Sequence, residues 1–161
     1  MIDGAPADSG MPARVRPRVV VVDADDRTRE SLVALLGIGG RLEVVGSAGA
    51  ASAASAVVRA TKPDAVLIDP RLPDVADGIA AVQAIRRESP GVRIVAMSPT
   101  VAEGERIVDC GADGSVRKTF RAQQLLEAIR SCLAPTGQAA APRSMGDGVS
   151  SGAAIKQNAA G

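Results

Sequence analysis

The chain has 161 residues, of which 46% are hydrophobic, and a formal net charge of +1, which favours one hydrophobic core. It contains no His, Tyr or Trp and only one Phe, so a histidine ligand or phosphocarrier and aromatic stacking on nucleic-acid bases are excluded. The balanced charge gives no argument for nucleic acid or membrane as partners, and no apolar run suits a signal peptide or membrane span, so we expect a cytoplasmic protein.

The two ends of the chain differ in composition from the middle. Residues 1–17 are rich in Pro, Ala, Gly and Arg without apolar periodicity, which predicts a disordered leader. Residues 135–161 are rich in Ala, Gly and Ser, which predicts a disordered tail without an output domain. Residues 18–134 are therefore the predicted folded domain.

Short apolar runs alternate with helical periodicity across residues 18–134. Runs too short for a helix, several of them β-branched, are predicted strands, and stretches with apolar residues three or four apart are predicted helices. The expected strands are residues 19–22, 42–46, 65–68, 92–97 and 115–117, and the expected helices are residues 28–36, 51–60, 78–88, 101–110 and 121–133. The fourth helix is predicted to be the weakest, because Gly104 disfavours a helix interior by about 1 kcal/mol.

This alternation predicts an α/β domain with a five-stranded parallel sheet covered by helices on both faces, because right-handed crossovers place helices on each side. The carboxyl ends of all strands then share one edge, where ligands of open α/β sheets bind. Four polar residues lie at or just after such strand ends: Asp23, Asp69, Ser98 and Lys118. We expect them to converge.

The types of these four residues suit phosphoryl chemistry. Mg²⁺ prefers oxygen ligands and needs only one or two carboxylates, which Asp69 and Asp23 can supply. Lys118 would neutralise one oxygen of an incoming phosphoryl group and the Ser98 hydroxyl could donate a hydrogen bond to another. Asp69 would act as the nucleophile and carry an acyl phosphate.

Several ordered motifs resemble those of the receiver domains of bacterial two-component response regulators. The resemblance covers residues 18 to about 133. It is carried by VVVDADD (20–26), PDAVLIDPRLPD (63–74), DG (77–78), IVAMS (94–98), GADG (111–114) and Lys118. It implies a single flavodoxin-like, doubly wound domain with strand order 2-1-3-4-5 and five helices.

The resemblance also implies roles for individual residues. Asp69 would be the phosphoacceptor, Ser98 the switch hydroxyl and Lys118 the phosphate-contacting lysine. Mg²⁺ would be held by Asp23, Asp69 and the backbone carbonyl of Arg71. A histidine kinase or a phosphotransfer protein would donate the phosphoryl group, and the chain would be no enzyme beyond self-catalysed transfer to Asp69.

The chain departs from the family's pattern at several positions. Ala24 stands where a second acidic residue normally ligates the metal, so Mg²⁺ binding is expected to be weakened. Asp25 could compensate, but the family's register makes it an N-cap of the first helix. Ser115 replaces the switch aromatic, and Thr119 replaces a common proline. The loop after Asp69 is one residue longer than usual, which would displace the Arg71 carbonyl.

The leading hypothesis is a stand-alone receiver that is phosphorylated on Asp69 and regulates a partner protein through the face formed by Val101–Leu133. One alternative is a pseudo-receiver that binds its partner without phosphoryl transfer, as Ala24 and Ser115 suggest. A second alternative, from another class, is a haloacid-dehalogenase-type phosphatase with Asp23 as the nucleophile and Asp25 as acid/base.

Overall fold

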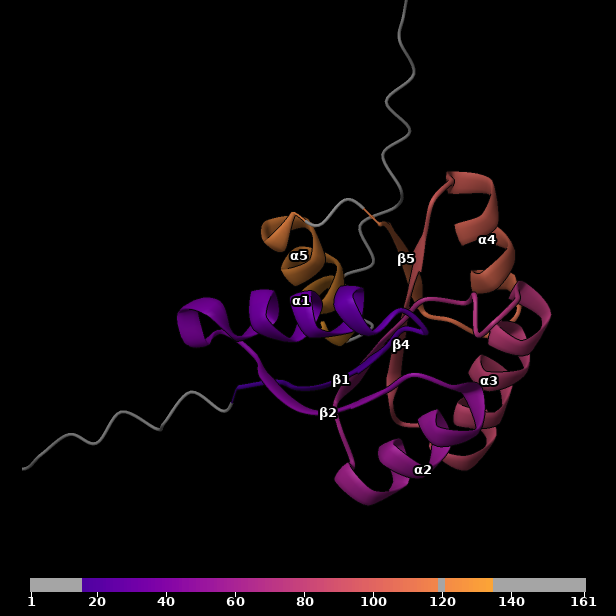
Figure 1. Ribbon diagram of the computed structural model, residues 1–161, viewed down its shortest axis with the longest axis horizontal. Coiled ribbons are helices and arrows are strands. Elements are labelled where there is room, and N and C mark those ends of the chain that lie inside the picture. The colour runs from indigo at the N-terminus through magenta and orange to yellow at the C-terminus, as the bar shows by residue number, and fades with distance from the viewer. Residues whose placement is uncertain (1–15, 119–120, 135–161) are drawn as a thin grey trace, which may run out of the picture.

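The computed structural model describes residues 16–118 and 121–134, in which five strands alternate with five α-helices (Figure 1). The strands are β1 (Arg18–Val22), β2 (Glu43–Ala48), β3 (Ala65–Ile68), β4 (Arg93–Ser98) and β5 (Gly114–Arg117). The α-helices are α1 (Asp26–Gly37), α2 (Ala51–Thr61), α3 (Val75–Glu88), α4 (Val101–Asp109) and α5 (Ala122–Leu133). A 3-10 turn, η1 (Ile38–Gly40), follows α1. Residues 1–15 of the predicted leader, the predicted tail (135–161) and Thr119 lie outside the described residues.

All neighbouring strands are parallel, in the order β2-β1-β3-β4-β5, which confirms the predicted sheet and strand order. Helices α1 and α5 cover one face, and α2, α3 and α4 cover the other (Figure 1). The carboxyl ends of the strands therefore lie at one edge of a sheet that is covered on both sides.

Strand β1 shows how the sequence builds these two layers. Its four valines are fully buried, but they alternate between faces: Val19 and Val21 pack with α1 and α5, whereas Val20 and Val22 pack with α2 and α3. A strand with helices on both faces needs a continuous apolar run, which explains why the central strands are uniformly hydrophobic.

Two helices begin earlier than the periodicity predicted, because short polar side chains cap them. Helix α1 begins at Asp26 rather than at Thr28: the Asp25 carboxylate accepts a hydrogen bond from the Thr28 amide at 2.7 Å. Helix α3 begins at Val75 rather than at Gly78, with Asp74 as its cap. The expectation that Asp25 is an N-cap is confirmed.

Two helical glycines allow close contacts near the carboxyl edge. A Cβ atom on Gly78 would lie 1.6 Å from the carbonyl oxygen of Pro70, so α3 packs directly on the loop after β3. A Cβ atom on Gly104 would lie 2.6 Å from Ser115 Oγ and 2.9 Å from Ser98 Oγ. Because Gly104 has no side chain, α4 can pack closely against β4 and β5. Helix propensity, which disfavours glycine in a helix interior, does not reveal this packing role.

Asp113 connects the start of β5 to two neighbouring elements. Its carboxylate accepts hydrogen bonds from the Ile94 amide at 2.8 Å and from Arg93 Nη1 at 3.0 Å, and it also pairs with Arg86 of α3. Burial alone would raise the pKa of Asp113, but the Ile94 amide and the arginines together hold this pKa below its usual value.

We predict that Asp113→Asn lowers the free energy of unfolding at neutral pH by about 1–3 kcal/mol, because charged hydrogen bonds are lost. A carboxyl group with a lowered folded-state pKa stabilises the fold above its unfolded pKa, near 3.9, and this stabilisation is lost as the pH falls through the folded value. The difference between wild type and variant in urea unfolding, followed by far-UV circular dichroism, should therefore shrink in acid. A difference that is independent of pH would contradict this account.

Candidate functional site

The backbone around the candidate site continues the ladder of the sheet beyond the strand ends. The Asp69 amide donates to the Val22 carbonyl at 2.8 Å, and the Asp23 amide donates to the Ala48 carbonyl at 3.0 Å. At the other side of the sheet, the Lys118 amide donates to the Ser98 carbonyl at 3.0 Å. The backbone of the residues that follow β1, β3 and β5 is therefore held by hydrogen bonds of the sheet, independently of their side chains.

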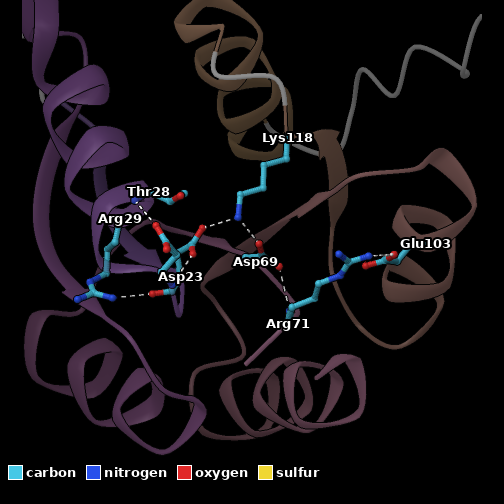
Figure 2. Close-up of polar contacts among 8 residues, drawn as sticks. Asp23, Thr28, Arg29, Asp69, Arg71, Glu103 and Lys118 are labelled. Carbon is cyan, nitrogen blue, oxygen red and sulfur yellow. Dashed lines mark hydrogen bonds and ion pairs between the residues drawn. The ribbon is translucent and has the colours of Figure 1, made fainter. Parts of the chain in front are cut away.

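The Lys118 ammonium lies between the two carboxylates (Figure 2). Its Nζ atom donates to Asp23 Oδ2 at 2.8 Å and also to Asp69 Oδ2. Asp23 is 1% exposed and Asp69 is 6% exposed, so two acidic groups are buried close together around one cation. The structure thus brings together three of the four residues that the sequence placed at this edge.

The two carboxylates hold the positive charge of Lys118. Burial alone would lower the pKa of this amine, but the hydrogen bonds and charges of Asp23 and Asp69 outweigh burial and raise the pKa above its usual value. Lys118 is therefore a fixed cation at neutral pH, which suits it to neutralising a phosphoryl oxygen.

The second oxygen of each carboxylate accepts a backbone N–H. Asp23 Oδ1 accepts from the Asp25 amide at 2.9 Å, and Asp69 Oδ1 accepts from the Arg71 amide at 2.9 Å. These bonds orient both carboxylates, so that the acidic pocket is built largely by the two loops that follow β1 and β3.

Ser98 is nearly fully buried at the end of β4, with 2% of its surface exposed. Its hydroxyl donates to the Thr100 carbonyl at 2.7 Å, and no hydrogen bond joins it to Asp69 or Lys118 within the described part of the chain. In this structure the hydroxyl therefore supports the turn into α4.

Two residues at this site were not predicted from the sequence. Arg29 Nη1 donates to the backbone carbonyl of Asp23 at 2.7 Å, and Gly49 lies directly against the same guanidinium. Glu103 of α4 pairs with Arg71 at 3.1 Å (Figure 2). For Arg29 the only sequence signal is its spacing from Asp26, three residues away on α1, with which it also pairs. A contact to a backbone carbonyl leaves no such signal.

The residues present offer a reduced set of ligands for Mg²⁺. Asp23 and Asp69 provide two carboxylates, and one or two suffice when waters complete the shell. Ala24 adds none, and Asp25 is committed to capping α1: the Thr28 amide, its main partner, lowers the pKa of this carboxyl. The described residues contain no group of three or more His, Cys, Asp or Glu side chains arranged to hold a metal. The two carboxylates are donors of the type that Mg²⁺ binds, and the described residues would leave the rest of its shell to water and backbone carbonyls.

Comparison with known proteins adds the decisive observation. A family model described as "Response regulator receiver domain" matches residues 19–130. The chain belongs to this family. This receiver domain is similar to two solved structures: the receiver domain of the putative response regulator NarL from Mycobacterium tuberculosis (29% identity, TM-score 0.65) and the response regulator domain of Thermotoga maritima CheB (27%, TM-score 0.66). Each comparison covers 73% of this chain and 96% of the solved chain.

Curated relatives of the receiver are longer proteins with different activities. A protein-glutamate methylesterase/protein-glutamine glutaminase from Cereibacter sphaeroides is 37% identical over 78% of this chain and 36% of its own length. The DNA-binding transcriptional activator DevR/DosR of Mycobacterium tuberculosis is 34% identical over 70% of this chain and 52% of its own length. The chain thus spans about a third to a half of these relatives. No helix in the described ranges is long and apolar enough to cross a membrane.

The phosphatase alternative does not survive these findings. That mechanism needs the Asp25 carboxyl as a free acid/base, yet this carboxyl caps α1. It also leaves Asp69 without a role, whereas Asp69 shares the Lys118 cation with Asp23. Membership of the receiver family agrees with the shared contact of Asp23 and Asp69 with Lys118.

We predict that Lys118→Met destabilises the receiver by about 3 kcal/mol, because two buried carboxylates lose the cation that they share. Adding Asp69→Asn should recover part of this loss by removing the repulsion between like charges. Urea unfolding of the wild type, both single variants and the double variant measures the coupling. Additive losses would show that Lys118 does not hold the two carboxylates together.

Proposed function

We propose that this receiver accepts a phosphoryl group on Asp69 from a histidine kinase or phosphotransfer protein and thereby regulates a protein partner. The observation that carries the proposal is the Lys118 ammonium, held between Asp69 and Asp23 at the carboxyl edge of the sheet. This arrangement offers a nucleophilic carboxylate and a fixed cation at the same point, as phosphoryl transfer requires.

The chemistry of the transfer follows from these groups. A carboxylate oxygen of Asp69 forms a bond to phosphorus while the bond between phosphorus and the donor group breaks, and the donor leaves with the bonding electrons. Lys118 neutralises negative charge on the phosphoryl oxygens, and Ser98, after rotating from Thr100, donates a hydrogen bond to one of them. Bound Mg²⁺, held by Asp23, Asp69 and the Arg71 carbonyl, would withdraw further charge from these oxygens.

The partner would bind the face formed by α4, β5 and α5, within residues Val101–Leu133, as in the family. Two longer relatives are a methylesterase/glutaminase and a DNA-binding activator, whereas the output of this receiver is a contact with a protein partner. A cytoplasmic location stays a prediction from the sequence.

Acetyl phosphate with Mg²⁺ should add the mass of one phosphoryl group to the intact protein, and the adduct should be labile to hydroxylamine, as acyl phosphates are. Asp69→Asn should abolish the adduct, because it removes the nucleophile. Asp109→Asn is the matched control, since this exposed carboxyl group lies on α4 and should leave the adduct unchanged.

Absence of an adduct from the wild type, both with acetyl phosphate and with a panel of histidine kinases, would favour the phosphorylation-independent pseudo-receiver. An adduct that survives Asp69→Asn would assign the phosphoacceptor to another residue. The first result shows whether the protein is phosphorylated at all, and the second shows whether the phosphoryl group is on Asp69.

Ala24→Asp should increase the affinity for Mg²⁺ by about tenfold, because a third carboxylate joins Asp23 and Asp69. Isothermal titration calorimetry with MgCl₂ measures the change. Ala53→Asp, which adds the same charge to an exposed position on α2, is the control. Equal affinities for the two variants would show that residue 24 does not face the metal.

A further inference from the structure

One arginine connects the candidate phosphoacceptor to helix α4. The backbone N–H of Arg71 donates to Asp69 Oδ1 at 2.9 Å, and its guanidinium donates to Glu103 Oε2 at 3.1 Å. Glu103 lies in the first turn of α4. Figure 2 shows the continuous path from Asp69 through Arg71 to Glu103.

The ion pair between Arg71 and Glu103 is weakly held. The Arg71 side chain is 54% exposed, so it can rotate without disturbing the core. Glu103 is only 15% exposed, and its Oε1 atom is buried without a hydrogen-bond partner among residues 16–118 and 121–134. Arg71 thus makes one side-chain contact and leaves Glu103 only partly satisfied, whereas a guanidinium binds a phosphoryl group through two parallel, charge-assisted hydrogen bonds.

Among residues 16–118 and 121–134, two further side-chain hydrogen bonds hold the start of α4. Thr100 Oγ1 caps the Glu103 amide at 3.2 Å, and the Thr100 carbonyl accepts from Ser98 Oγ at 2.7 Å. Ser98 and Arg71 therefore each connect the carboxyl edge of the sheet to this turn.

We propose that the Arg71–Glu103 ion pair is a latch through which the charge on Asp69 controls helix α4. In the unphosphorylated receiver the latch is closed, and Arg71 binds Glu103. A phosphoryl group on Asp69, with its greater negative charge, recruits the Arg71 guanidinium and releases Glu103, which frees the first turn of α4. The inference rests on the proposed function, because it requires the phosphoryl group; it adds Arg71 and Glu103 as positioning residues for the response of α4.

Hydrogen exchange of the α4 amides, followed by mass spectrometry on the full chain with and without acetyl phosphate and Mg²⁺, tests the latch. Phosphorylation of the wild type should speed exchange in the first turn of α4 by about two- to five-fold, the size expected for one weak ion pair. Glu103→Ala and Arg71→Ala should each produce this faster exchange without phosphorylation. The double variant should show no further increase, because both changes remove the same contact.

The response to phosphorylation distinguishes a broken latch from a general loss of stability. A variant that is only less stable would still show faster α4 exchange when phosphorylated. In each single variant, phosphorylation should add no more than a small further increase in α4. Glu88→Ala is the matched control, because it removes an ion pair between the last residue of α3 and Arg59 of α2. This variant should respond like the wild type.

Intact mass recorded on the same samples separates failure of the proposed function from failure of the latch. A wild type without an adduct overturns the proposed function and the latch with it. An adduct without faster α4 exchange, or a Glu103→Ala variant that responds like the wild type, overturns the latch alone. Faster exchange in the phosphorylated wild type that is lost in both single variants establishes it.

Discussion

The site depends on one interaction: the Lys118 ammonium between the carboxylates of Asp23 and Asp69. Two buried carboxylates at close range repel each other, and a cation between them offsets this repulsion. The sheet supplies that cation from β5, because residues that follow parallel strands meet at one edge. This arrangement agrees with family membership, with the acidic pocket and with the proposed nucleophile. Hydrogen bonds from the backbone amides of the same three residues keep their side chains in place.

The contacts around this cluster extend toward helix α4. Ala24 supplies no carboxylate beside Asp23, and the Arg29 guanidinium donates to the backbone carbonyl of Asp23. On the other side Arg71 contacts both Asp69 and Glu103. Ser115, in place of an aromatic side chain, lets α4 pack closely through Gly104. In this receiver, therefore, charge contacts and close backbone packing surround Asp69, the candidate phosphoacceptor.

The sequence predicted the sheet and the meeting of Asp23, Asp69 and Lys118, because buried apolar runs mark strands and parallel strands share an edge. It placed the starts of α1 and α3 two or three residues late, since Asp25 and Asp74 cap these helices before the apolar periodicity begins. The partner of Ser98 was not predictable, because a hydroxyl rotates freely about one bond and the choice between Thr100 and the acidic pocket depends on three-dimensional geometry. Glu103 was missed for a similar reason: its partner, Arg71, comes from a distant loop.

The most direct test of the central claim is to locate the acyl phosphate in the chain. After treatment with acetyl phosphate and Mg²⁺, borohydride reduction converts an aspartyl phosphate to homoserine, and peptide mass spectrometry identifies the position. We expect homoserine at position 69, with its yield strongly reduced when Lys118 is replaced by Met. Homoserine at position 23, or an unchanged yield at position 69 without Lys118, would contradict it.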